Sequence, residues 1–367
     1  MNISATNHHA SQDPRQGADN LLKFCLGIKP GETILLVLEE DDSLYDRELG
    51  AQIERRCQDL GTYVTVITEP LINHATEFPE SVSSVMRTVD HTLFLSRLGD
   101  YVRFVELPGH CTKTTSYTYT LEQLGSPYAS VSHTLLAHLR DKLEQELMAA
   151  STWQITCPLG TNLKGSFCWP SLQGGDDDEL LVGLFPVSTF KPIPCETATG
   201  CVALSRWLMP GGAPKIESAG MSLSSTVYCD VLDGRIQRFF GPAEESEKVT
   251  QHYDRIASTL GINRNRVHSW HLGINPQTFF PTDPDLNFEQ WCALSFGSPR
   301  YLHFHTCGDE PPGEIAWSLF NCTVLIDDQP YWKNGQFIWL NRADNRELIS
   351  EYAGAEILFD PSLSIGV

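Results

Sequence analysis

One short segment near the amino end constrains the fold more than any other. Residues 33–38 form a continuous apolar run without polar alternation. Such a run is typical of a strand that is buried on both faces, as in a parallel sheet covered by helices. An amphipathic segment follows at residues 44–60 and ends before Gly61, and residues 63–68 form a second apolar strand. This order predicts a β-α-β unit with parallel strands and a right-handed crossover.

The next part of the chain continues this pattern. Residues 81–87 are predicted to be helical and residues 91–95 to form a third strand. Residues 113–119 are rich in β-branched and aromatic side chains, which favours a fourth strand. A short helix over residues 20–26 and a long helix over residues 131–149 flank these elements. We therefore expect an α/β domain built on a parallel sheet.

The character of the sequence changes after about residue 155, where Gly, Pro and short strands dominate. Asp233-Gly234 and Asn334-Gly335 indicate hairpin turns, and residues 243–260 form a predicted helix. A strand at residues 153–157 leads into this part.

The fold class predicted from these elements is α/β, with a parallel-sheet domain followed by a mixed α+β domain. The predicted divisions are a disordered segment over residues 1–15, an N-terminal domain over residues 16–152 and a C-terminal domain over residues 153–367 that holds the functional site.

The composition excludes several classes of function. The formal net charge of the 367 residues is -20, which argues against nucleic-acid surfaces and anionic membranes, because both select clustered Lys and Arg. The amino end lacks a basic region followed by an apolar run, and no stretch of about 18 apolar residues occurs. The eleven cysteines have no CxxC spacing and are expected to be reduced. We therefore predict a cytoplasmic protein that does not contact membranes.

The strongest candidate site is the pair His303 and His305. Residues i and i+2 of a strand point to the same face, so this spacing places two imidazoles side by side. A third ligand is predicted at His271, just before a Gly-Ile-Asn-Pro turn, with His268 as a competitor and Glu314 as a nearby carboxylate. Imidazoles suit iron, zinc, copper or nickel. The alternative is that the histidines only form hydrogen bonds with carbonyl groups in a half-buried strand.

Two other segments are weaker candidates. Residues 107–113 follow the third strand unit and are expected to lie beyond the carboxyl ends of the strands, where open α/β sheets bind ligands. His110 in this segment is a candidate acid or base, although a polar loop with a surface histidine explains the same residues. Cys111 has no identifiable partner that would lower its pKa. Residues 158–165 form a glycine-bounded connection without the spacing of a nucleotide-binding loop.

Several short segments, in this order along the chain, resemble the aminopeptidase T family of metallopeptidases and its oxygenase relative, 2,5-dihydroxypyridine 5,6-dioxygenase. The resemblance begins with the Gly-Ile-Lys-Pro-Gly-Glu segment before the first strand. The matching segments are residues 27–32, 155–163, 233–236 with Gly241, 272–276, and 321–327 with 334–335.

The resemblance implies an N-terminal α/β domain, a C-terminal domain that holds metal, and a dimer. The peptidases hold two metals through Glu, His, Tyr and Asp, and the oxygenase holds one iron through two His and one Asp. Residues 185–190 lack the Glu that the peptidases carry there, and residues 315–320 lack the expected His-x-Asp pair.

Three hypotheses follow. The first is a mononuclear non-haem iron-dependent oxygenase acting on a small aromatic or amino-acid-derived metabolite, with Fe(II), or Zn or Mn, held by the three histidines. In it, His110 or His268 assists proton transfer, and Tyr301, Trp270 and Glu314 contact substrate. The second is a metal-dependent hydrolase close to the aminopeptidases. The third is a non-catalytic descendant that binds a peptide or small molecule in a biosynthetic pathway.

Overall fold

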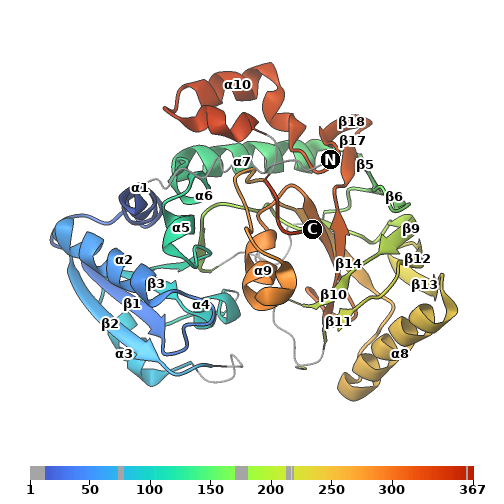
Figure 1. Ribbon diagram of the computed structural model, residues 1–367, viewed down its shortest axis with the longest axis horizontal. Coiled ribbons are helices and arrows are strands. Elements are labelled where there is room, and N and C mark those ends of the chain that lie inside the picture. Colours follow the sequence, from blue (N-terminus) through green and yellow to red (C-terminus); the bar gives the residue numbers. More distant parts are fainter. Residues whose placement is uncertain are drawn as a thin grey trace. The chain divides into compact units, whose positions relative to one another are not determined.

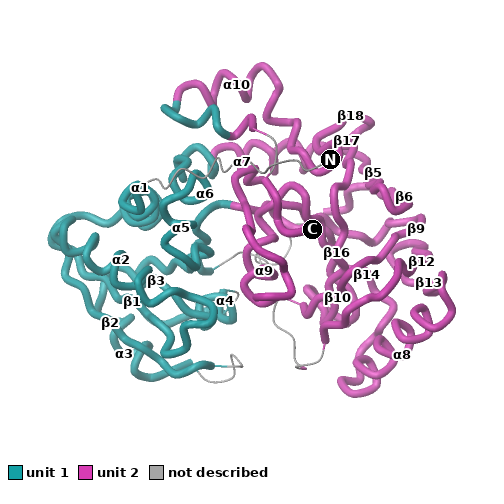
Figure 2. The backbone as a smooth tube through the Cα atoms, viewed as in Figure 1, with its two compact units in different colours: residues 1–137, 172–187, 352–357 teal, residues 138–171, 188–351, 358–367 magenta. Residues whose placement is uncertain are grey.

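The chain forms two compact units in the computed structural model (Figure 2). Unit 1 comprises residues 1–137, 172–187 and 352–357, and unit 2 comprises residues 138–171, 188–351 and 358–367. The domain boundary predicted between residues 152 and 153 stays a prediction. The residues that the structure describes are 13–72, 78–103, 105–169, 181–211, 216, 219–360 and 363–367.

Unit 1 is built on a five-stranded sheet in which all neighbouring strands are parallel (Figure 1). Its apolar run is β1, and the four side chains from Ile34 to Val37 are fully buried, as expected for a strand covered on both faces. The predicted parallel α/β architecture is confirmed. In spatial order the strands are β2 (Tyr63–Glu69), β1 (Thr33–Glu39), β3 (His91–Leu95), β4 (Thr112–Ser116) and β7 (Gly183–Phe185).

The helices of unit 1 follow the predicted order with local differences. Pro14 and Arg15 already belong to a helix, because Asp13 caps its first turn by accepting from the Arg15 N–H; residues 1–12 of the predicted disordered segment lie outside the described residues. The strand predicted to reach residue 119 ends at Ser116, since its three-residue partner β7 ends at Phe185. The helices are α1 (Pro14–Asp19), a π-helix (Asn20–Cys25), α2 (Arg47–Asp59), α3 (Glu80–Met86), α4 (Arg97–Tyr101), α5 (Leu121–Leu124), α6 (Pro127–Ser130) and α7 (His133–Ala149), which continues into unit 2.

Unit 2 contains two antiparallel sheets, which confirms the predicted mixed α+β part. The seven-stranded sheet has the order β13 (Arg235–Phe240), β12 (Val227–Leu232), β9 (Thr199–Leu204), β6 (Asn162–Ser166), β5 (Thr152–Thr156), β17 (Thr323–Ile326) and β18 (Gln329–Trp332). The six-stranded sheet has the order β11 (Met221–Ser222), β10 (Trp207–Pro210), β16 (Ile315–Phe320), β15 (Tyr301–Thr306), β14 (Val267–Leu272) and β8 (Ile193–Pro194).

An aromatic layer joins these two sheets. Trp153 of β5 and Trp270 of β14 meet edge to face, with ring centroids 5.6 Å apart, and both are buried. Tyr253 is also buried; its hydroxyl lies 2.7 Å from the hydroxyl of Thr306 and accepts from the indole N–H of Trp317. The helices of this unit are α8 (Ala243–Leu260), α9 (Phe288–Ser295) and α10 (Ala343–Ser350), with short 3-10 segments at Pro284–Leu286 and Ile338–Asn341; a further one, Ala355–Phe359, spans both units.

The turn signals are confirmed by the backbone. Asp233 and Gly234 both have positive φ, as do Asn334 and Gly335, which is the conformation of the tight hairpin turns that these pairs favour. A third turn was missed. Asp327 and Asp328, also at positive φ, join β17 to β18 without a glycine.

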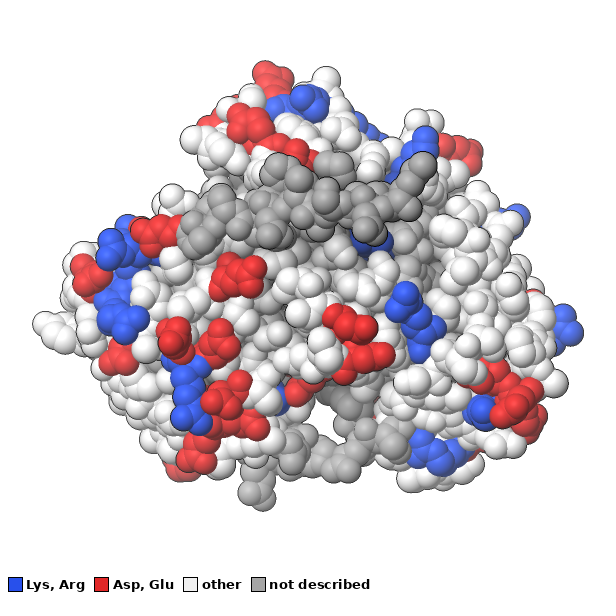
Figure 3. All heavy atoms as spheres, in the orientation of Figure 1, with Lys and Arg blue, Asp and Glu red and all other residues white. Residues whose placement is uncertain are grey.

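In the described part of the chain, no helix is long and apolar enough to cross a membrane. On the face drawn in Figure 3, Lys and Arg side chains lie singly or beside Asp and Glu rather than in a continuous basic surface.

A tight turn after β14 generates a prediction about stability. A Cβ atom on Gly273 would lie 2.2 Å from the carbonyl carbon of Gly297, so the two backbones can meet there only without a side chain. We expect Gly273→Ala to lower the free energy of unfolding by roughly 1–3 kcal/mol through this clash. Urea unfolding measures the change. The control is Gly220→Ala, where the nearest atom, 3.2 Å away, belongs to the side chain of Pro210. Equal midpoints for the two variants would contradict the argument.

Candidate metal centre

The pairing of two adjacent strands brings three histidines together. In the ladder between β14 and β15, His271 lies opposite His303 and Ser269 lies opposite His305. Opposite residues of an antiparallel pair share a face, as do alternate residues of one strand. The imidazoles of His271, His303 and His305 therefore project from one face. Their ring centroids are 3.7 Å (271–303), 5.0 Å (271–305) and 5.1 Å (303–305) apart.

The donor atoms of these histidines fit one metal ion. One ring nitrogen from each residue can be chosen so that all three lie within 4.8 Å of one another. Ligands bound to one ion at about 2.1 Å lie at most about 4.2 Å apart, so nitrogens at the upper limit of 4.8 Å must move closer together to share an ion. Within the described residues this is the only such group of three or more His, Cys, Asp or Glu side chains, and it contains no carboxylate. A set of three imidazoles suits iron, zinc, copper or nickel.

Aromatic side chains surround the innermost imidazole. His303 is 1% exposed; the Phe296 ring meets it edge-on at 4.4 Å and the Tyr301 ring stacks at 5.6 Å. Trp291 of α9 in turn contacts Tyr301 at 5.8 Å. His271 and His305 are half-buried. The site thus has an apolar side at His303 and a more accessible side at the other two imidazoles.

The helix that supplies this packing was missed by the sequence analysis. Asn287 caps α9 by accepting from the Gln290 N–H, and Phe288, Trp291 and Leu294 recur on one side of the helix. An Asn followed by apolar residues at a spacing of three is an ordinary helix-start signal, so this element was detectable.

His268 occupies a different environment from the three histidines. The ladder register shifts between Val267 and Ser269, so His268 is the extra residue of a β-bulge. It is buried, and its Nε2 lies 3.2 Å from the carbonyl oxygen of Gly308. Burial, followed by the positive charge of Arg266, lowers the pKa of His268 to about 4. The ring is therefore neutral at pH 7, and its predicted role in proton transfer stays a prediction.

The three predicted substrate contacts are placed differently from one another. Tyr301 lies on the face of the imidazoles; its hydroxyl is 3.1 Å from that of Ser318, and burial raises the pKa of its phenol. Trp270 points to the opposite face and is fully buried against Trp153, which gives it a packing role between the sheets. Glu314 is buried just before β16, and its carboxylate is outside the three-histidine group.

His110 lies in unit 1 and is exposed in the loop that leads into β4. The expectation that this loop lies beyond the carboxyl ends of the strands is wrong. After β3 the chain passes through α4 and returns to the amino end of the parallel β4. His110 therefore lies at the amino ends of the strands. Its predicted catalytic role stays a prediction without support from this position.

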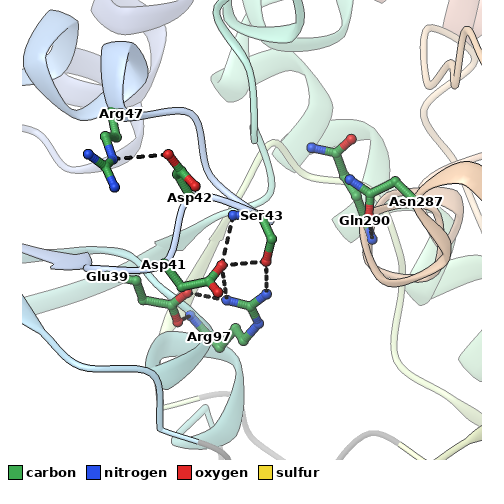
Figure 4. A network of polar contacts seen from close by, with 8 residues as sticks. All are labelled: Glu39, Asp41, Asp42, Ser43, Arg47, Arg97, Asn287 and Gln290. Atoms are coloured by element: carbon green, nitrogen blue, oxygen red, sulfur yellow. Dashed lines mark hydrogen bonds and ion pairs between the residues drawn. The ribbon is translucent and has the colours of Figure 1, made fainter.

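A polar network lies instead at the carboxyl ends of the strands of unit 1 (Figure 4). Glu39 ends β1, and its carboxylate accepts from the backbone and guanidinium of Arg97, which follows β3. The guanidinium also donates to the Ser43 hydroxyl at 2.9 Å. The side chains of Glu39 and Arg97 are 3% and 8% exposed. Because strand order reverses at β1, this is the edge where open α/β sheets usually bind ligands, and here a buried ion pair occupies it.

Comparison with known proteins finds matches among solved structures but not among family models or curated sequences. No family model matches the chain, and no curated protein sequence matches it. Among solved structures, 2,5-dihydroxypyridine dioxygenase from Pseudomonas putida KT2440 matches with a TM-score of 0.57 at 12% identity, over 91% of this chain and 98% of that one. AmpT from Thermus thermophilus matches with a TM-score of 0.51 at 14% identity, over 89% and 99%.

The chain shares the fold of these two proteins. The resemblance inferred from short sequence segments is thereby confirmed at the level of the fold. Because one neighbour is a dioxygenase and the other carries the name AmpT, the shared fold does not choose between activities.

The depressed pKa of His268 generates a prediction about acid stability. The unfolded ring has a pKa of about 6.5, so folding favours its neutral form. The resulting stability is complete above pH 6.5 and is lost as the pH falls from about 6.5 to 4. We expect His268→Gln, which keeps a neutral N–H donor, to make the free energy of unfolding fall less steeply in this window, by up to about 1.4 kcal/mol per pH unit. Urea unfolding at several pH values measures this slope, with the exposed His138→Gln as control. Parallel curves for wild type and His268→Gln would refute the assignment.

Proposed function

We propose that this protein is a mononuclear non-haem iron-dependent oxygenase that acts on a small aromatic or amino-acid-derived metabolite. The observation that carries the proposal is the convergence of His271, His303 and His305 on one face of two adjacent strands. Three protein ligands leave positions on an ion open. Ferrous iron with open positions supplies dioxygen activation beside a bound substrate.

The residues around the site have distinct parts in this proposal. His271, His303 and His305 hold the ion. Phe296 and Tyr301 pack against His303, which fixes its ring and excludes water from that side. The half-buried His271 and His305 leave the side from which substrate would approach.

The charge of the ligand set supports a substrate with an anionic group. Imidazoles that bind metal are neutral, so three of them leave the full charge of a divalent ion on the site. A carboxylate or phenolate on the substrate compensates this charge in a partly buried setting. Aromatic acids, phenols and amino-acid derivatives offer such groups.

A metal-dependent hydrolase is the second candidate, favoured by the likeness to AmpT. A two-metal hydrolytic site holds its ions about 3.5–4 Å apart, which takes more ligands than three histidines. The described group has only these three, and residues 185–190 and 315–320 contain no His, Asp or Glu. The non-catalytic alternative predicts a folded protein without metal.

We also propose a cytoplasmic homodimer, on the basis of the family resemblance.

Metal content separates the three functions. We expect protein purified anaerobically to contain about one iron per chain, and His271→Ala, His303→Ala and His305→Ala each to weaken metal binding by more than about 100-fold, since each removes one ligand. Elemental analysis measures the content, and the exposed His138→Ala is the matched control. Two ions per chain together with peptide cleavage would refute the oxygenase and support the metal-dependent hydrolase. A metal-free protein with an intact fold would support the non-catalytic binding protein.

The open positions can be tested without a known substrate. Nitric oxide binds ferrous iron where dioxygen does, and electron paramagnetic resonance detects the adduct. We expect wild-type ferrous protein to give this signal and His303→Ala to lose it with the metal. A ferrous protein that does not react with nitric oxide would contradict the proposed open positions.

A further inference from the structure

Ser269 lies against His305, one of the two half-buried histidines of the proposed metal centre. It sits directly opposite His305 in the β14–β15 ladder and is 8% exposed. Its Oγ is 3.3 Å from Nδ1 of His305. The ladder is regular from Leu272 to Ser269, and the bulge at His268 comes immediately afterwards. The serine is therefore held at the last regular pair, where its side chain must share the face of the imidazoles.

The hydroxyl of Ser269 can accept from Nδ1 of His305 or donate to it, and the direction of this hydrogen bond decides which ring nitrogen is available to a metal. A neutral imidazole carries one proton, and the nitrogen without it holds the lone pair that binds metal. When Nδ1–H donates to a fixed oxygen, Nε2 is left as the ligand atom, and metal-binding histidines nearly always have such a partner. We propose that Ser269 is a positioning residue that holds the proton of His305 on Nδ1 and so presents Nε2 to the metal. The presentation of Nε2 to a metal rests on the proposed function, whereas the position of the proton on Nδ1 does not.

A second serine provides an internal comparison. Ser318 of β16 lies directly opposite His303, on the same face, and is fully buried. Its hydroxyl lies 3.1 Å from the hydroxyl of Tyr301, which gives it a phenol as its partner. The two serines thus match in residue type, strand setting and adjacency to a histidine, and they differ in what the hydroxyl contacts. Ser318→Ala is therefore a control for removing a buried hydroxyl from this face.

The proton position can be measured in metal-free protein. Full-length protein with 15N-labelled histidine, stripped of metal by a chelator, gives separate signals for the two tautomers in long-range 1H–15N spectra, and His305→Gln identifies the signal of His305. We expect the Nδ1–H form in wild type, a shift toward Nε2–H in Ser269→Ala, and the wild-type form in Ser269→Thr and Ser318→Ala. An Nε2–H ring in wild type would overturn the proposal, as would an unchanged ring in Ser269→Ala.

Zinc affinity tests the consequence for the metal. Competition against a chelating dye should show a 10- to 100-fold weaker zinc affinity, as an order of magnitude, for Ser269→Ala. Ser269→Thr, which restores the hydroxyl, and Ser318→Ala should stay close to wild type. If wild type binds no zinc, the proposed metal centre fails while the tautomer measurement still decides the role of Ser269. If wild type and Ser269→Ala bind zinc equally, the metal centre stands and the positioning role is refuted.

Discussion

The candidate site depends on the register between β14 and β15. Because side chains alternate along a strand, a slip of one residue would turn every histidine of one strand to the opposite face. The buried inner face holds this register. Trp270 and Phe304 are paired across the ladder and fully buried against Trp153 and Trp317, so a slip of either strand would remove a large aromatic ring from this packing. The core between the two sheets of unit 2 thus fixes the positions of side chains that lie outside it.

The same register explains why His268 and His271 differ although they are three residues apart. His271 belongs to the regular part of the ladder and faces His303. His268 is the bulged residue, its ring lies near the carbonyl of Gly308, and burial lowers its pKa to about 4. Both were candidate ligands in the sequence, where His271 was preferred for its place just before the turn and His268 was its competitor. A bulge is set by the pairing of two strands, and pairing is not encoded in the local pattern of either one.

Local signals predicted much of the fold. The apolar run of β1, the turns with Asp233 and Asn334 and the helix over residues 243–260 all depend on neighbouring residues, and all are confirmed. Non-local pairing was not predictable in the same way. Strand β7 has three residues and joins the parallel sheet from a segment far along the chain. The position of His110 at the amino ends of the strands depends on a short helix, α4, through which the chain returns to the amino end of β4. For the site, the alternation of side chains along a strand predicted that His303 and His305 share a face. The position of His271 beside them follows only from the pairing of β14 with β15.

The fold shared with a dioxygenase and with AmpT leaves the chemistry to the residues placed on it. On the face of the imidazoles, β16 contributes Ala316 and Ser318, opposite His305 and His303. Neither side chain has the carboxylate that a second ion or a mixed histidine–carboxylate set would require. Among the described residues, the only group of His, Cys, Asp or Glu side chains close enough to share an ion is the three imidazoles from β14 and β15. Since both strands belong to one rigid ladder, the separation of the three rings is set by strand spacing and rotamers rather than by a mobile loop, which favours a single ion held in a preorganised site.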